Sequence, residues 1–382
     1  MPAMTLKAVK AKFGDALILT TDDATVLIDG GPPGVYKKFL SKHIALMDDG
    51  GMDPPEIDLM MISRIDSDHI ACILDMTGDM VETDEDDARP PARIVQAWLN
   101  SFSDTLVQNG LESQSSSDAA PASMASAFDT DDDLAAEVDG HTKMVLSSVK
   151  QGRNLRRDLN TLSVPINAMF ANKMAIAGAA DPWEKGGLKI TVVGPTQKEV
   201  DRLKARWAKD LKKILKKEAD KKAAAQSMDS SVFNLSSIVC IAEAGDKSIL
   251  LTGDARGDTM LNWLEERGGP FEFDVFKLPH HGSDRNVTVP MFEKIKAKHY
   301  LVSGDGKHGN PEPAMFDMLF RARGDKDYTI HMTYSPDELK AHKEFLKHDL
   351  GAALAAVLDA EPWRRDKLRF PGDGETSITL DL

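Results

Sequence analysis

The stretch "ISRIDSDHIACI", residues 62–73, joins a strand pattern to a cluster of polar side chains. It continues the largely apolar run EIDLMMIS at residues 56–63, which predicts a buried strand. Asp66, Asp68 and His69 then follow within one short segment. Polar clusters directly after a buried strand are typical of ligand sites in layered α/β folds. This stretch therefore predicts both the class of fold and the position of a site.

The flanking sequence supports a layered α/β fold. Short apolar runs separated by turn residues predict strands, and residues 34–47 have helical spacing. The first predicted strands lie within residues 6–13, 15–21 and 24–31, and a later pair, residues 236–245 and 247–255, has the pattern of a hairpin. A start of strands, helix and strand is what such a fold requires.

Polar residues recur after four apolar strands. The four clusters are at residues 66–69, 252–254, 280–283 and 305–308. Because ligand sites in such folds form at the ends of strands, we expect the four clusters to converge on one site.

The side chains of the first three clusters are suited to metal binding. They offer carboxylate and imidazole donors and no thiolate, which suits Zn²⁺, Mn²⁺ or Fe and not a structural cysteine site. These donors are Asp66, Asp68, His69, Asp254, His280 and His281. Taken separately, the Asp-x-Asp-His run also fits a capped turn, and the His-His pair also fits a hydrogen-bonded loop. Their joint occurrence in one chain favours a metal centre, with Asp254 as the carboxylate that bridges two metals.

The order of the motifs resembles that of a known family. The chain contains in sequence FGDALIL, TVLIDGG, ISRIDSDHI, NLSSIVCI, ILLTGDA, VFKLPHHGS and SGDGKHGNP. This set resembles the metallo-β-lactamase fold, and specifically the hydrolase domain of ComEC-type DNA-uptake proteins. The resemblance covers roughly residues 5–80 and 188–320. It implies a four-layer αββα sandwich, here with a long insertion.

Carried over residue by residue, the resemblance implies a set of roles. It makes Asp68, His69 and His280 ligands of one metal, with Asp254 as the bridge and Asp66 on the second metal. His281 would then orient water or phosphate, and His308 is a candidate general acid or phosphate contact. Asp29 resembles the family's structural aspartate behind the ligands. The implied cofactor is one or two divalent ions, Zn²⁺ or Mn²⁺.

Arg64 departs from the family pattern, which has a histidine at this position. A guanidinium has no lone pair for a metal, so one metal site loses a ligand. Three consequences are open. The centre could hold one metal firmly and a second weakly, Arg64 could act as a fixed phosphate clamp, or Arg64 could turn away and pair with an acid.

The remainder of the chain predicts one domain, residues 1–382, with an insertion at 101–187. The composition of residues 101–140 predicts a mobile segment that could cover the site until a regulatory protein or a protease removes it. Residues 198–222 carry eleven Lys or Arg against five acids, which predicts a basic helix. This helix could contact a nucleic-acid backbone, or it could be a solvated amphipathic helix.

Composition limits the class of protein. A net charge of −14 argues against a surface that binds polyanions over its whole area. The absence of a signal-type N-terminus and of a long apolar run predicts a soluble protein that does not bind membranes, and the two cysteines in apolar runs fit a reducing cytoplasm.

The sequence therefore predicts a metal-dependent hydrolase, most specifically a phosphodiesterase or nuclease with nucleic acid or another phosphodiester as substrate. Two alternatives stay open from the sequence. One is hydrolysis of a lactone, thioester or amide, and the other is a regulatory module whose catalysis Arg64 has weakened.

Overall fold

The structure is a computed structural model, and it describes residues 4–86, 88–100, 140–171, 173–202, 237–339 and 349–382. For residues 140–149 only the backbone is described. The predictions for the mobile segment at 101–140 fall almost wholly outside the described residues. Most of the predicted basic helix, from residue 203 onward, also lies outside them.

The first sheet contains the N-terminal strands and the strand that leads to the Asp/His cluster. In spatial order it consists of β16 (Ser377–Asp381), β1 (Thr5–Val9), β2 (Leu17–Thr20), β3 (Thr25–Ile28), β5 (Leu59–Ile62) and β7 (Ala97–Leu99). Pairing is antiparallel from β16 to β3 and parallel from β3 to β7. The ends of β3 and β5 therefore lie at the same edge of the sheet.

The second sheet is the larger of the two. In spatial order it consists of β15 (Leu368–Arg369), β14 (Thr329–Met332), β13 (Lys296–Val302), β12 (Glu272–Lys277), β11 (Lys247–Leu251), β10 (Val239–Ala244), β9 (Leu188–Gly194) and β8 (Trp183–Lys185). The predicted hairpin is confirmed, since β10 and β11 pair antiparallel with Cys240 opposite Leu251. Strands β11 to β15 run parallel, so the ends of β11, β12 and β13 share one edge. A separate short pair joins β4 (Glu56–Ile57) to β6 (Arg93–Ile94).

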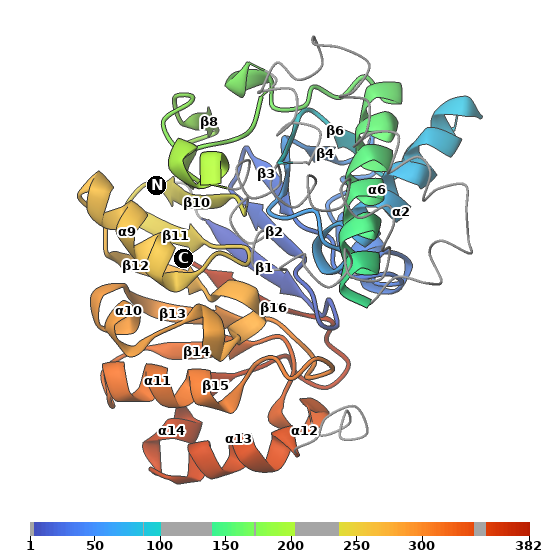
Figure 1. The fold of residues 1–382 in the computed structure, drawn as a ribbon. Coiled ribbons are helices and arrows are strands. Elements are labelled where there is room, and N and C mark those ends of the chain that lie inside the picture. The colour runs from blue at the N-terminus through green and yellow to red at the C-terminus, as the bar shows by residue number, and fades with distance from the viewer. Residues whose placement is uncertain (1–3, 87, 101–139, 172, 203–236, 340–348) are drawn as a thin grey trace, which may run out of the picture.

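Helices form the two outer layers (Figure 1). The first sheet is covered by η1 (Tyr36–Leu40), α1 (Ser41–Ala45), α2 (Ser67–Glu85) and α6 (Gly140–Thr161). The second is covered by α9 (Gly257–Arg267), α10 (Val289–Lys294), α11 (Pro313–Arg323) and α13 (Leu350–Asp359). The short elements η3 (Ala168–Phe170), η5 (Pro279–Gly282), η6 (Asp284–Asn286), α12 (Pro336–Leu339) and α14 (Trp363–Asp366) lie in the connections. The predicted four-layer αββα sandwich is confirmed.

Part of the predicted insertion belongs to these layers. Helix α6 packs against α2, and β8 extends the second sheet by pairing antiparallel with β9. The weak sequence pattern over residues 140–187 therefore conceals elements that cover the core.

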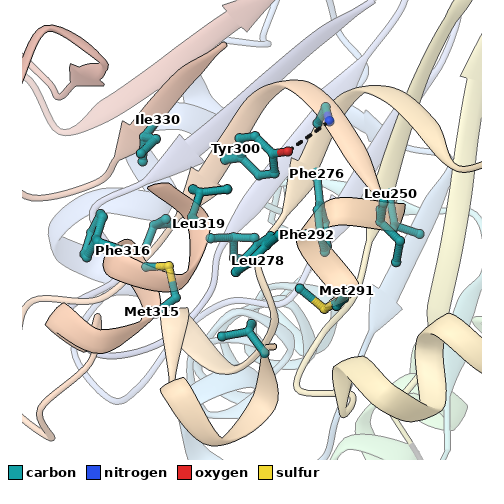
Figure 2. Packing of buried hydrophobic residues seen from close by; sticks show 14 of the residues in the cluster. Leu250, Phe276, Leu278, Met291, Phe292, Tyr300, Met315, Phe316, Leu319 and Ile330 are labelled. Atoms are coloured by element: carbon teal, nitrogen blue, oxygen red, sulfur yellow. Dashed lines mark hydrogen bonds between the residues drawn. The ribbon is translucent and has the colours of Figure 1, made fainter. Parts of the chain in front are cut away.

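Three buried clusters of apolar side chains hold the layers together. One lies between the sheets, where residues such as Leu19 and Met61 of the first sheet meet Cys240 and Val275 of the second. The other two lie under the outer helices. Figure 2 shows the cluster on the outer face of the second sheet, in which the ring centroids of Phe276, Phe292 and Tyr300 are 6.0–6.4 Å apart.

The outer cluster also satisfies its polar atoms. The Tyr300 hydroxyl accepts a hydrogen bond of 3.2 Å from the Ala297 amide, drawn as a dashed line in Figure 2.

Within the described ranges, no helix is both long and apolar enough to cross a bilayer.

Candidate metal centre

The site lies where strand ends from both sheets meet. Asp29 follows β3, Arg64 follows β5, Asp254 follows β11, and η5 after β12 carries His280 and His281. Asp66 is the N-terminal cap residue of α2, and Asp68 and His69 lie in the first turn of that helix. The structure thus brings together three of the four predicted clusters, as the convergence of strand ends requires.

Four side chains form a compact group of metal-ligand atoms. Asp68, His69, Asp254 and His281 each offer one atom, and these atoms all lie within 4.8 Å of one another. His69 Nε2 is 3.3 Å from Asp254 Oδ1 and 3.9 Å from Asp68 Oδ2. His281 Nε2 is 3.2 Å from Asp68 Oδ2 and 3.9 Å from Asp254 Oδ1.

These separations fit a tetrahedral ion. Ligand atoms at ordinary zinc distances of about 2.1 Å from a tetrahedral ion are about 3.4 Å from one another. His69 Nε2 and Asp254 Oδ1 are also buried and have no hydrogen-bond partner. Buried polar atoms are rarely left unsatisfied, so two such atoms facing each other indicate a missing ligand. The residues present therefore fit a divalent cation.

His69 is oriented by a carboxylate behind it. Its Nδ1 lies 2.9 Å from Asp29 Oδ2, which directs Nε2 toward the group. Asp29 is itself held by the Ser63 amide at 2.7 Å and by the Ser63 hydroxyl at 2.5 Å. Metal-binding histidines typically donate their other nitrogen to such a carboxylate. Asp29 thus lies where the sequence predicted a structural aspartate.

His281 has an equivalent support that the sequence did not predict. Its Nδ1 lies 3.2 Å from the Ser303 hydroxyl and 3.5 Å from Asp15 Oδ1. The other oxygen of Asp15, Oδ2, accepts a hydrogen bond of 2.7 Å from Lys277 Nζ. Asp15 and Lys277 are both buried, and Ser303 also donates to Asp15 Oδ1. Each histidine of the group therefore has a carboxylate on its outer nitrogen.

The carboxylates of the site are stabilised in their charged form by the cationic side chains around them. Burial raises the pKa of Asp254, but the charges of His280, His69 and Arg64 lower it by more than burial raises it. The pKa of Asp254 therefore lies well below its usual value. Burial also raises the pKa of Asp68, yet the effects of His69 and His281 bring it to about 2. Both carboxyl groups are ionised at neutral pH.

The histidines respond in turn to the carboxylates around them. Burial lowers the pKa of His69, but the carboxylates of Asp254, Asp68 and Asp29 raise it well above its usual value. For His281, burial is likewise outweighed, chiefly by Asp15, and the pKa rises to about 9. An environment that attracts protons so strongly also attracts a cation.

Arg64 points into the site and does not turn away from it. Its Nη1 donates to Asp254 Oδ2 at 2.6 Å, and its Nη2 is paired with Asp66 Oδ2. The side chain is buried, and Nε has no hydrogen-bond partner. The acid pair expected as one of the three consequences is therefore present, but it is formed with residues of the site itself.

The two adjacent histidines differ from the predicted assignment. His281 stands with Asp68 and His69, where the sequence placed His280. His280 Nε2 instead lies 3.8 Å from the other oxygen of Asp254, Oδ2, and its Nδ1 is 3.0 Å from the Asn286 side-chain oxygen. Both histidines have positive φ, 49° and 54°, so the backbone turns sharply between them and sends the rings to different sides. Such a turn leaves no pattern in the sequence.

The structure gives Asp66 another partner than the sequence predicted, and it places His308 on a loop, as the sequence predicted. Asp66, predicted on a second metal, is ion-paired with Arg64. His308 is exposed on the loop after β13, where its ring stacks edge-on with Phe13 at a centroid distance of 4.5 Å. Burial and the charge of Lys307 lower the pKa of His308, while the charge of Asp68 opposes this effect. Its role as general acid stays a prediction.

Signals for the missed residues were present in the sequence. Asp15 is part of the FGDALIL motif, and Lys277 interrupts the otherwise apolar strand pattern at VFKLP. A charged residue within a buried strand needs a buried partner. The residue before Asp15 must be a glycine, because a Cβ at position 14 would lie 1.9 Å from the carbonyl oxygen of Asp68.

Comparison with known proteins gives weak likenesses. No family model matches the chain. Microtubule-associated protein 1A from mouse is 28% identical over 88 residues, 23% of this chain and 3% of that protein, and the human protein is 27% identical over the same length. The chain thus spans only a few per cent of the curated relatives it matches.

Solved structures of similar arrangement share little sequence with the chain. CmlA, a diiron β-hydroxylase from Streptomyces venezuelae, has a TM-score of 0.41 and 9% identity, covering 100% of this chain and 54% of that one. A metallo-β-lactamase with a HARLDQ motif from Cronobacter sakazakii has a TM-score of 0.32 and 12% identity, covering 94% and 92%. Zn²⁺-bound PqqB from Methylobacterium extorquens has a TM-score of 0.35 and 11% identity, covering 97% and 88%. These scores lie below 0.5, so the description of the fold rests on the layers and the strand order themselves.

Proposed function

We propose that this chain is a metal-dependent hydrolase whose metal ligands are Asp68, His69, Asp254 and His281. The observation that carries the proposal is the pair of buried atoms His69 Nε2 and Asp254 Oδ1, which face each other at 3.3 Å and have no hydrogen-bond partner. Burying two such atoms without a partner costs free energy that a bound cation would recover. The carboxylates behind His69 and His281 support the same assignment.

A divalent ion bound there would supply Lewis acidity and would lower the pKa of a water molecule. The residues of the chain provide the remainder of the site. Asp29 and Asp15 fix the orientation of the two imidazole rings. Arg64 places a permanent positive charge beside Asp254, where charge that develops on a substrate oxygen would be stabilised. His308, on the loop after β13, is the candidate to donate a proton to the departing oxygen.

For the substrate we propose a phosphodiester, with nucleic acid as one form of it. Support comes from the ordered motifs that resemble ComEC-type hydrolases and from the donor set of the site. A guanidinium and imidazoles around an oxygen-rich centre suit the charge of a phosphate ester. Because no described feature favours a lactone, thioester or amide, we do not propose these as substrates.

The two adjacent histidines offer a sharp test of the ligand set. Protein purified without chelator and supplied with Zn²⁺ or Mn²⁺ should retain metal in elemental analysis. His281→Ala and Asp254→Ala should each lower metal affinity by at least tenfold, and they should abolish hydrolysis of bis(p-nitrophenyl) phosphate. His280→Ala, one residue away, should retain the tightly bound metal, because His280 lies outside the four-residue group.

Several results would contradict the proposal. Native protein that holds no metal above background would overturn the metal centre. Metal loss in His280→Ala but not in His281→Ala would overturn this ligand set. Bound metal without cleavage of the diester, combined with cleavage of a lactone or thioester, would overturn the substrate class alone.

A further inference from the structure

The two oxygens of Asp254 face different partners. Oδ1 faces His69 Nε2 at 3.3 Å and His281 Nε2 at 3.9 Å. Oδ2 accepts a hydrogen bond of 2.6 Å from Arg64 Nη1 and lies 3.8 Å from His280 Nε2. This is the arrangement of a carboxylate that bridges two cations, with a metal-ligand group on one side and a guanidinium on the other.

We infer that the centre holds a single metal ion and that the Arg64 guanidinium takes the place of a second. This inference rests on the proposed function for the first ion. It adds that the cation position at Asp254 Oδ2 is closed to metal and that the Arg64 side chain closes it.

The surroundings of Arg64 support this assignment. Arg64 lies between two carboxylates, because its Nη2 is paired with Asp66 Oδ2 and its Nη1 with Asp254 Oδ2. His280 Nε2 is 3.8 Å from the same oxygen of Asp254, and carboxylates and imidazoles are donors that suit a divalent ion. Arg64 is ion-paired with both carboxylates, and the three side chains Arg64, Asp66 and Asp254 are buried. Both carboxylates of this second position are therefore already engaged by a cation.

Charge and chemistry keep a metal out of this position. A guanidinium remains protonated at any pH at which the protein is folded, and it has no lone pair to offer. Burial lowers the pKa of Arg64, but Asp66 and Asp254 more than offset this effect. A divalent ion at Oδ2 would have to displace the guanidinium from two buried carboxylates and then lie beside its charge, which is strongly unfavourable in a buried site.

Metal stoichiometry tests the inference without depending on activity. We expect the native protein, loaded with excess Zn²⁺ and passed through a desalting column, to retain one ion per chain. Arg64→His replaces the guanidinium with an imidazole beside Asp66, Asp254 and His280, so the ratio should rise to two. Isothermal titration with Zn²⁺ should show a second binding event in this variant only.

Two further variants control the experiment. Arg256→His makes the same substitution at an exposed arginine that lies two residues after Asp254 and is paired with Asp258. The ratio of Zn²⁺ to protein should stay at one in this variant. Asp66→Asn should also leave one ion bound, because Asp66 is paired with Arg64 and is not one of the four residues that offer ligand atoms to the group. This variant keeps the test decisive if Arg64→His fails to fold.

The outcomes separate the two proposals. Two ions in the native protein would overturn the inference and leave the metal-dependent hydrolase standing. One ion in a folded Arg64→His variant, or loss of the single ion in Asp66→Asn, would also overturn it. No ion in the native protein would overturn the proposed function, and the single-ion centre with it.

Discussion

Arg64 and Asp254 determine the chemistry that this site can support. Among the three consequences that the sequence left open for Arg64, the structure shows an acid pair formed inside the site, with Asp66 and Asp254. This ion pair keeps the positive charge of Arg64 inside the site, because the guanidinium lies beside the Asp254 carboxylate. In the single-metal centre proposed above, Arg64 would therefore stabilise charge while the four-residue group holds the metal.

Asp15 is expected to act as a positioning residue for His281. Asp15→Asn keeps the size of the side chain but removes the negative charge that faces His281 Nδ1 at 3.5 Å and Lys277 Nζ at 2.7 Å. We expect metal affinity to fall by about 10–100-fold, as is typical when a carboxylate behind a histidine ligand is lost. Competition with a chromophoric chelator measures this change directly.

Asp274→Asn is the matched control for this measurement. Asp274 is also a buried aspartate paired with a lysine, Lys298, but it is not among the contacts of the four-residue group. Its replacement should leave metal affinity unchanged. Equal loss of affinity in both variants would show that Asp15 acts only through general stability.

Strands β13 and β14 bring together a second pair of histidines that plays no part in the site. His331 Nε2 lies 3.1 Å from His299 Nδ1, and His331 Nδ1 is buried without a partner. Burial first, and then the neighbouring His299, lower the pKa of His331 to about 4. In the unfolded chain the same ring has a pKa of about 6.5.

This difference predicts a pH dependence of folding. Between pH 6.5 and 4 the unfolded chain takes up a proton at His331 that the folded protein does not. The contribution of His331 to the free energy of unfolding is therefore fully present above pH 6.5. It falls as the pH decreases, by at most about 1.4 kcal/mol per pH unit. Urea denaturation of His331→Gln beside the native protein should show a shallower loss over this range. Parallel curves for the two proteins would contradict the expected role of His331.

The stability of the whole sandwich comes largely from its buried apolar clusters, whereas the geometry of the site is set at the strand ends. Phe292 on α10 is fully buried against Phe276 and Tyr300, in the cluster that Figure 2 shows. Phe292→Ala should lower the free energy of unfolding by about 3–5 kcal/mol, because it removes a ring and leaves a cavity. The metal ratio of the folded fraction should not change, since no residue of the site belongs to this cluster. A loss below about 1 kcal/mol, measured by urea denaturation, would show that the layer repacks.

Much of the fold could be predicted from local patterns. The apolar run at residues 56–63 and the hairpin of β10 and β11 are visible in the order of residue types, because strand faces and turns leave periodic signals. The helix α6 and the strand β8 were not predicted, because their segment has a weak pattern and they are stabilised by packing on α2 and β9. Element formation there depends on tertiary contacts more than on propensity.

The sequence by itself determined which chemical groups the site contains. Asp68, His69, Asp254 and a His-His pair after strands predict donors for a metal at the strand ends, since the position of a polar cluster after a buried strand is a local property. Only the tertiary structure decided how these groups are paired. The left-handed turn at His280 and His281, the two-sided contacts of Asp254, and the support of His281 by Asp15 and Lys277 join residues up to 266 positions apart, the separation of Asp15 and His281. Such pairings are set by how the two sheets stack, and stacking brings side chains together at distances that no spacing along the chain records.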